Sequence, residues 1–432
     1  MNKSSFVIKG NICYSADKEH IRTVESGYAV CINGISKGVF EMLPEEYKHL
    51  EVEDFGDQLI IPGLVDLHIH APQFAYRGLG MDLELLDWLQ TYAFPEETKY
   101  RDLDYAKKAY GMFVDSMRKS ATTHASIFAT RHREATELLM GMMEESGLVS
   151  MIGKVNMDRE APDHLRELSA EEARVETIEW IENVLGKYEH TKPILTPRFI
   201  PSCTDDLMHH LHDIQMKYDL PIQSHVSENL GEIAWVQELR PTSRFYGDAY
   251  DQDGLFGKEY STGRSVPTIM AHCVYSSEAE AELIKKNGVM VAHCPASNMN
   301  LSSGIAPIRK YLDMGICVGL GSDIAGGQTE SIFRAMTDAI QVSKMYWRIV
   351  DKSAKPLTFA EAFYMATAGG GQFFGSVGKF EVGYEFDAIV LNDEKLVHPQ
   401  ELSIRQRLER FAYLGGDVTG IEAKYVAGNR IL

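Results

Sequence analysis

The chain has 432 residues, of which 44% are apolar and 24% are charged, an ordinary balance for a globular protein with a large core. Asp and Glu outnumber Lys and Arg by 62 to 43, so the formal net charge is −19. A chain this acidic repels phosphate backbones and anionic lipids, which excludes nucleic-acid polymers and membrane surfaces as expected partners.

The first 60 residues have the texture of β-strands. A strand beginning at Phe6 is expected to turn at Gly10-Asn11, and a second turn is expected at Asn33-Gly34, a dipeptide typical of tight hairpins. Strand patterns return in the last 55 or so residues of the chain. We therefore predict one small β-sandwich domain built from both ends, residues 1–60 and 378–432.

Between these ends, residues 61–377 alternate between short apolar runs and longer amphipathic stretches. This alternation is typical of a parallel sheet covered by helices. Eight runs predict a (β/α)8 TIM-like barrel, and hence an α/β protein. The runs are Gly63–His70, Ala121–Ala129, Ser150–Met157, Ile194–Phe199, Pro221–Val226, Thr268–Val274, Val289–His293 and Cys317–Leu320.

Cysteine usage and hydropathy bear on the compartment. The six cysteines are scattered and form no CxxC pair, which argues against a disulfide framework and against thiolate zinc sites. No apolar stretch reaches about 18 residues, so we expect no transmembrane helix. These features predict a cytoplasmic protein.

Histidines and one aspartate stand where several apolar runs end. The first run ends in His68 and His70, which share one strand face, and later runs end near His225, His272 and Asp323. Taken singly, each histidine also fits a hydrogen-bonded core residue, and the aspartate fits a helix N-cap. Their shared position at the carboxyl ends of strands favours a metal site of the N/O type that binds Zn²⁺ or Fe²⁺.

Two further features define the expected chemistry. The fourth run ends at Arg198-Phe199 with no lysine to bridge two metals, which favours one metal per chain. Such a site lowers the pKa of water toward neutrality. Glu228 follows His225 by three residues, where it could shuttle a proton to a leaving nitrogen; a solvated turn carboxylate is the alternative.

Several motifs together resemble the amidohydrolase superfamily, specifically its aminohydrolase/chlorohydrolase branch, and within it the guanine deaminase family. The resemblance covers essentially the whole chain. The segments that carry it are Pro62–His70, Ala71-Pro72-Gln73, Leu85–Leu89, Phe94-Pro95-Glu96, Thr196–Phe199, Ser224–Asn229, His293–Asn298 and Gly321–Gly327.

The resemblance implies a single Zn²⁺ ion held by His68, His70, His225 and Asp323. It assigns proton transfer to Glu228 and Asp323, and a hydrogen bond to the activated water or the substrate to His272, whose direct ligation of the metal stays open. The residues implied to surround the substrate are His70, Ala71, Pro72, Gln73, Trp88, Arg198, Phe199, His225, Glu228 and Asp323. For Trp88, a place in the helix core is the alternative.

The implied reaction is hydrolysis of guanine to xanthine and ammonia, and the implied assembly is a homodimer. Two alternatives stay open: a related hydrolase that deaminates or dechlorinates another heterocycle, and a non-catalytic scaffold of the same fold. His124, which stands near the second run's end, is left without a role.

Overall fold

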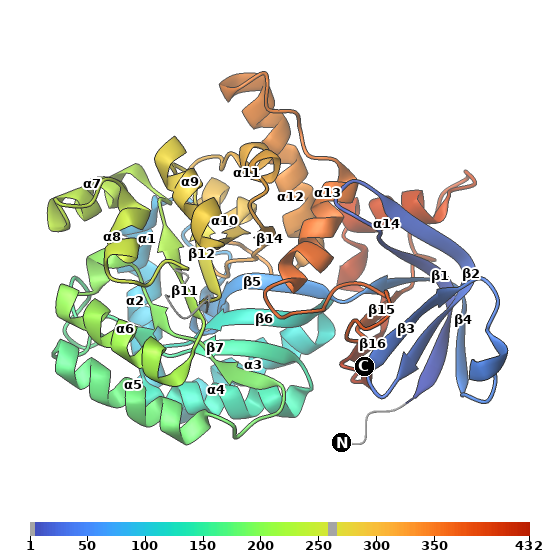
Figure 1. The fold of residues 1–432 in the computed structure, drawn as a ribbon, viewed down its shortest axis with the longest axis horizontal. Coiled ribbons are helices and arrows are strands. Elements are labelled where there is room, and N and C mark those ends of the chain that lie inside the picture. The colour runs from blue at the N-terminus through green and yellow to red at the C-terminus, as the bar shows by residue number, and fades with distance from the viewer. Residues whose placement is uncertain (1–4, 258–265) are drawn as a thin grey trace.

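The computed structural model describes residues 5–257 and 266–432. Its described residues contain two four-stranded parallel sheets and one two-stranded parallel sheet beside a larger mixed sheet (Figure 1). Residues 1–4, part of the predicted segment 1–60, and residues 258–265, part of the segment 61–377, lie outside the described residues. Within the described residues, no helix is long and apolar enough to cross a membrane.

Strands from both ends of the chain form one seven-stranded sheet, on the right of Figure 1. The central pairing joins β4 from the N-terminal part to β15 from the C-terminal part, antiparallel. In spatial order the strands are β17 (Asn429–Arg430), β16 (Ile421–Val426), β15 (Ala388–Leu391), β4 (Val52–Pro62), β1 (Phe6–Ser15), β2 (Ile21–Ile32) and β3 (Ile35–Phe40).

The remaining strands form parallel sheets, as the apolar runs predicted, and all eight runs contain a strand. All residues of β5 and β6 are buried, as expected for strands covered on both faces. One sheet has the order β5 (Leu64–His70), β6 (Thr122–Phe128), β7 (Val149–Gly153) and β9 (Thr191–Pro193); the other has β11 (Ile222–Val226), β12 (Thr268–His272), β13 (Met290–His293) and β14 (Val318–Leu320).

The fourth run is the weakest strand. Only Thr196–Pro197 forms a strand there, β10, paired with β8 (Val155–Asn156). Proline lacks an N–H and cannot donate to a ladder, which accounts for its brevity. A bridge between Leu195 and Ile222 links this region to β11.

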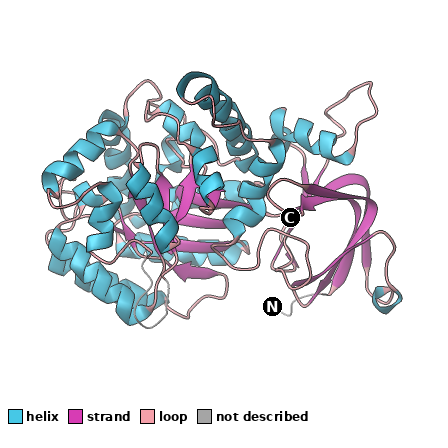
Figure 2. Ribbon diagram, turned by 45° about the horizontal axis from the view of Figure 1, so that its top comes forward, coloured by secondary structure: helices cyan, strands magenta, loops and turns pink. Residues whose placement is uncertain are grey.

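Helices surround the two parallel sheets (Figure 2). Several begin at a side chain that accepts a backbone N–H, such as Asp102, Ser169, Thr204 and Ser277. The helices are α1 (Leu85–Trp88), α2 (Phe94–Thr98), α3 (Leu103–Lys119), α4 (Arg133–Ser146), α5 (Ala170–Val184), α6 (Asp205–Tyr218), α7 (Leu230–Leu239), α8 (Tyr246–Gln252), α9 (Glu278–Asn287), α10 (Pro295–Asn300), α11 (Ile308–Met314), α12 (Ile332–Met345), α13 (Phe359–Tyr364) and α14 (Ile404–Tyr413).

The two predicted N-terminal turns have different outcomes. The hairpin at Asn33-Gly34 is confirmed: both residues have positive φ, and β2 pairs with β3 across them. The turn at Gly10-Asn11 is wrong, because β1 continues through these residues as one strand with a bulge. A bulge absorbs an extra residue without reversing the chain, and the Gly-Asn signal alone does not distinguish the two.

Two buried polar side chains join the seven-stranded sheet region to the part of the chain that holds β6 and α3. His124 lies near the start of β6, away from its carboxyl end, with Nε2 3.1 Å from Glu385 Oε1 and Nδ1 3.7 Å from Asp387 Oδ2. Burial alone would lower the pKa of His124, but these two carboxylates raise it. Its role is therefore an ion-pair contact with the C-terminal segment.

Lys424 in β16 makes the second connection. Its side chain is fully buried, and Nζ donates to the main-chain oxygens of Met117 (3.1 Å), Arg118 (3.3 Å) and Ser120 (3.0 Å) at the end of α3. The Lys424 N–H groups satisfy carbonyls that the helix leaves unpaired. Burial lowers the pKa of the Lys424 amine well below its usual value.

We expect Lys424→Met to lower the free energy of unfolding by ~2–4 kcal/mol, because three buried carbonyls lose their donor. Urea unfolding followed by fluorescence measures this. The matched control is Lys395→Met, at an exposed lysine, for which a change within about 0.5 kcal/mol is expected. Equal unfolding midpoints for the two variants would contradict a stabilising role for Lys424.

Candidate metal centre and substrate cavity

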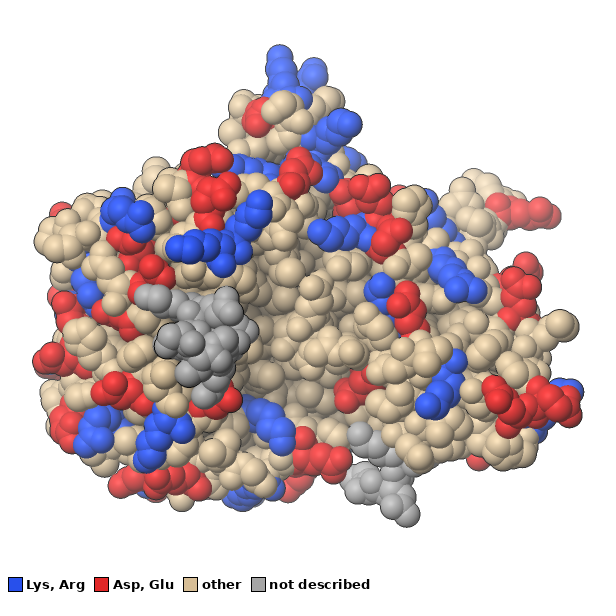
Figure 3. All heavy atoms as spheres, viewed as in Figure 1, with Lys and Arg blue, Asp and Glu red and all other residues tan. Residues whose placement is uncertain are grey.

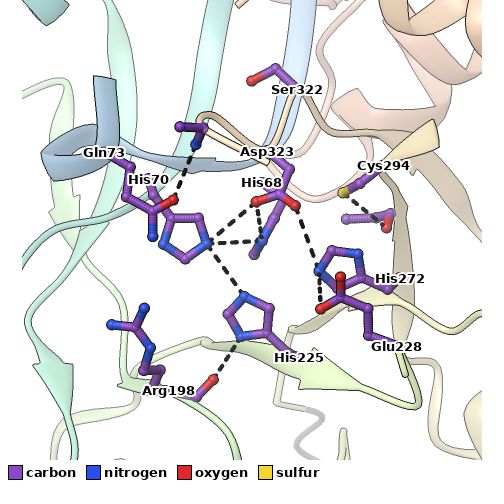
Figure 4. A network of polar contacts seen from close by, with 12 residues as sticks. His68, His70, Gln73, Arg198, His225, Glu228, His272, Cys294, Ser322 and Asp323 are labelled. Atoms are coloured by element: carbon purple, nitrogen blue, oxygen red, sulfur yellow. Dashed lines mark hydrogen bonds and ion pairs between the residues drawn. The ribbon is translucent and has the colours of Figure 1, made fainter. Parts of the chain in front are cut away.

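Three imidazoles and one carboxylate converge at the carboxyl ends of the parallel strands (Figure 4). His70 Nε2 lies 3.2 Å from His68 Nε2 and 3.3 Å from His225 Nε2. Asp323 Oδ1 lies 3.2 Å from His68 Nε2 and 3.4 Å from His70 Nε2. The four side chains come from β5, β11 and the segment after β14.

This spacing fits a metal ion. Ligand atoms around a tetrahedral ion with bonds of about 2.0–2.1 Å are about 3.3–3.4 Å apart. Burial, followed by the neighbouring imidazoles, lowers the pKa values of His70 and His225 well below the usual value, so both imidazoles are neutral near pH 7. Nitrogen lone pairs this close repel one another unless a cation or a shared proton lies between them. These residues therefore form a candidate metal-binding site.

Backbone contacts hold the ligands in place. His225 Nδ1 donates to the Arg198 carbonyl oxygen at 2.6 Å, which leaves the Nε2 lone pair facing the other ligands. Asp323 has φ of +49°, and its N–H donates to the His68 carbonyl oxygen at 2.8 Å. Asp66 accepts hydrogen bonds from the backbone N–H groups of His68 and Ser322. These bonds connect β5 to the segment that carries Asp323.

His272 and Glu228 form a second pair beside the ligands. His272 Nε2 lies 3.3 Å from Glu228 Oε2 and 3.8 Å from Asp323 Oδ2, while its Nδ1 lies 2.9 Å from Asn298 Oδ1. Ser303 Oγ donates to Glu228 Oε1 at 3.0 Å. His272 Nε2 therefore lies closer to the Glu228 carboxylate than to the Asp323 carboxylate.

The carboxylates in the site have opposite pKa shifts. Burial, and then the Asp323 charge, raises the pKa of Glu228 to about 8. Burial alone would raise the pKa of Asp323, but the surrounding imidazoles, led by His68, hold it well below the usual value. Glu228 is therefore able to hold and release a proton near neutral pH, whereas Asp323 stays ionised.

A cavity opens beside these groups and has an empty volume of about 380 Å³. The lining combines aliphatic side chains and Trp88 with charged and amide groups. The lining residues are His70, Gln73, Leu85, Trp88, Leu89, Arg198, His225, Glu228, His272, Leu301, Asp323 and Gly326. A cavity of this kind, with a few convergent polar groups among apolar side chains, suits a small ligand.

Three predicted substrate residues do not line this cavity. Ala71 and Pro72 are buried in the short turn Ala71–Tyr76 that carries Gln73, and Phe199 is buried with its ring centroid 6.2 Å from that of Trp235. Trp88 does line the cavity, and its Nε1 donates to the Leu79 carbonyl oxygen at 3.4 Å.

The sequence analysis missed several residues that support the site. Glu97 pairs with Arg198, Asn298 orients His272, Ser303 donates to Glu228, and the Phe128 ring centroid lies 4.5 Å from that of His70. Asn298 is the last residue of the segment His293–Asn298, and Glu97 directly follows Phe94-Pro95-Glu96. Their position in or next to a family motif is therefore the one feature of the sequence that points to them. No local pattern distinguishes Ser303 or Phe128 from ordinary polar and core residues.

The resemblance drawn from the sequence is confirmed by comparison with known proteins. The amidohydrolase family model matches residues 59–422, and the chain belongs to this family. A guanine deaminase of Dictyostelium discoideum is 40% identical over 388 residues, 88% of this chain and 84% of that protein. The Mus musculus guanine deaminase is 37% identical over 96% of this chain and 92% of its own.

A solved structure is similar over nearly its whole length. It is the guanine deaminase from C. acetobutylicum with guanine bound in the active site, 47% identical to this chain. The TM-score is 0.95, and the similarity covers 99% of this chain and 100% of the other.

We expect the purified protein to hold about one equivalent of divalent metal, and His68→Ala to lose most of it, because the variant lacks one ligand. Inductively coupled plasma mass spectrometry measures this. The control is His293→Ala, which removes a buried histidine at the end of β13 and should leave the metal content unchanged. Two equivalents of metal, both required for activity, would contradict the single-ion site.

Proposed function

We propose that the protein is a guanine deaminase that hydrolyses guanine to xanthine and ammonia. The carrying observation is the set of converging metal ligands beside a cavity that presents Gln73 and Arg198 on one side and Glu228 on the other. The similarity to a guanine deaminase with guanine in its active site supports this choice of substrate.

Zn²⁺ is the proposed metal, with Fe²⁺ as the alternative that the same donor set accepts. The ligands are His68, His70, His225 and Asp323, one ion per chain. When bound, the metal lowers the pKa of water so that hydroxide is available near neutral pH. His272, 3.8 Å from Asp323 Oδ2, is proposed to hydrogen-bond the water or the substrate.

Glu228 is the proposed proton carrier. Water adds its oxygen to C2 of guanine, and the Glu228 carboxylate takes one of the water protons and delivers it to ring nitrogen N3. The proton left on the added hydroxyl moves by way of Asp323 to the exocyclic amine, the C2–N bond breaks, and ammonia leaves as the C2 carbonyl of xanthine forms. The contact with Ser303 keeps the carboxyl pointed at the cavity. Asp323 is the second group proposed to move a proton during this sequence.

Arg198 and Gln73 are proposed to bind the purine. A guanidinium donates in a planar fork, which suits the carbonyl oxygen of guanine. The Trp88 side chain and three leucines supply apolar walls for the flat ring. Phe199, Ala71 and Pro72 do not line the cavity. Their proposed role is to shape the backbone that carries Arg198 and Gln73.

Two alternatives are less well supported. A hydrolase acting on another amino- or chloro-substituted heterocycle would need the same metal ligands but gives no reason for Arg198 beside Gln73 at the cavity wall. A non-catalytic scaffold would not need a buried Glu228 whose pKa is raised to about 8 beside the ligand set.

For the architecture, we infer that the two parallel sheets are halves of one (β/α)8 barrel over residues 61–377, beside a β-sandwich domain of residues 1–60 and 378–432. The bridge between Leu195 and Ile222 supports closure on one side. Backbone hydrogen bonds from Asp323 N to His68 O and from His70 N to Ile324 O support closure on the other.

A homodimer and a cytoplasmic location complete the proposal. Apolar side chains are exposed where α12 ends, in an arm that projects from the top of Figure 1: Met345, Trp347, Ile349 and Val350. Burial of such a patch favours association, and the molecular mass measured by sedimentation equilibrium tests the dimer.

The six free cysteines suit a reducing compartment, and cell fractionation tests the cytoplasmic location. Acidic and basic side chains are interspersed on the face in Figure 3.

Guanine should be deaminated far faster than adenine. Adenine has an amine where guanine has its carbonyl, so an Arg198 donor would face another donor. A cavity built around that hydrogen bond should disfavour adenine by about 10⁴-fold or more in kcat/KM. An ammonia-release assay with both purines at equal concentration measures the ratio, and comparable values would contradict the proposed substrate.

Glu228→Gln should retain metal and purine binding and lose turnover by about 10²–10⁴-fold, since the amide has nearly the same shape but carries no transferable proton. Single-turnover measurement with guanine, alongside metal analysis, tests this. The matched control is Glu282→Gln on α9, outside the cavity lining, which should turn over normally. A normal rate for Glu228→Gln would exclude the proton-carrier role.

A further inference from the structure

Glu97 lies behind the cavity wall and is the shared partner of the two proposed purine-binding side chains. It belongs to α2, it is fully buried, and it is outside the cavity lining. Its carboxylate accepts from Arg198 Nη1 at 2.5 Å and Nη2 at 3.0 Å, and from Gln73 Nε2 at 3.0 Å. One carboxylate therefore fixes both side chains.

The bidentate pair determines how Arg198 faces the cavity. Glu97 takes one N–H from each terminal nitrogen of the guanidinium, which fixes the plane of the group and leaves its remaining donors for a ligand. The Arg198 side chain is 4% exposed and that of Glu97 is 1% exposed. A guanidinium so deeply buried needs an anionic partner, because an unpaired charge at this depth is strongly unfavourable.

The same carboxylate determines which way the Gln73 amide points. Since Nε2 donates to Glu97, Oε1 is turned the other way, where it accepts from the Ala325 N–H at 3.1 Å. The amide then offers the cavity one N–H donor and one oxygen lone pair in a fixed order. A rotated amide would exchange donor and acceptor.

We propose that Glu97 is the positioning residue that sets the hydrogen-bond pattern by which the site selects an oxopurine. This inference rests on the proposed function and adds a determinant of specificity to it. Glu97 touches neither the metal ligands nor the reacting atoms; it acts through Arg198 and Gln73. Without it, the donors aimed at the purine carbonyl and the amide order of Gln73 are no longer fixed.

Hypoxanthine and purine separate this role from catalysis. Hypoxanthine has the carbonyl and adjacent ring N–H of guanine but no amine to lose, and purine lacks the carbonyl. The holoenzyme should bind hypoxanthine more tightly than purine, as measured by isothermal titration calorimetry. In Glu97→Gln this preference should fall by about 100-fold, because the new amide turns an N–H toward the Arg198 or Gln73 donors.

Two further variants make the test specific. Glu97→Asp keeps the charge and both acceptor oxygens on a shorter side chain and should show an intermediate preference, about tenfold below wild type and about tenfold above Glu97→Gln. The control is Glu96→Gln: this neighbouring buried glutamate pairs with Lys99 and Tyr105 and should keep the wild-type preference. Metal content should stay at one equivalent in all three variants.

The outcomes separate the two proposals. If the wild-type protein does not deaminate guanine, the proposed function fails. If it does, and Glu97→Gln retains metal and fold with a hypoxanthine-over-purine preference within about twofold of wild type, the role of Glu97 is overturned. Should Glu97→Gln fail to fold, Glu97→Asp decides: a folded variant with unchanged preference overturns the role, and a reduced preference supports it.

Discussion

The close spacing of the candidate ligand atoms is the constraint on which the site depends. Imidazole nitrogens of His68, His70 and His225 lie 3.2–3.3 Å from a neighbour, and the side chains of His68 and His70 are buried. Only a rigid backbone holds such groups together before a cation binds. The left-handed conformation of Asp323 and the contacts of Asp66 across β5 provide part of that rigidity.

The cavity divides the chemistry between two walls. On one wall, Glu228 and His272, the groups proposed to handle protons, are held by Ser303 and Asn298. On the opposite wall, Arg198 and Gln73, the side chains proposed to bind the purine, are held by the Glu97 carboxylate, which is outside the cavity lining (Figure 4). Both walls use buried partners to orient the groups that face the ligand, so their precision comes from residues outside the cavity lining.

The sequence predicted the features that have a period or a fixed spacing. Apolar runs located the parallel strands, and the HxH of β5 located two candidate metal ligands, because a strand places alternate side chains on one face. Contacts between distant residues have no local pattern: Glu97 meets Arg198 across 101 positions, and Ser303 meets Glu228 across 75. The Gly10-Asn11 error has a similar origin, since only the partner strands distinguish a bulge from a turn.

The pairing of β4 with β15 has a consequence for biosynthesis. The N-terminal strands emerge from the ribosome first, yet their central partner lies far later in the chain, at residues 388–391. The seven-stranded sheet cannot close until those residues have been synthesised. During that interval the edge of β4 is an unpaired strand edge, of the kind that pairs with other chains, so nascent copies are most prone to aggregation before β15 emerges.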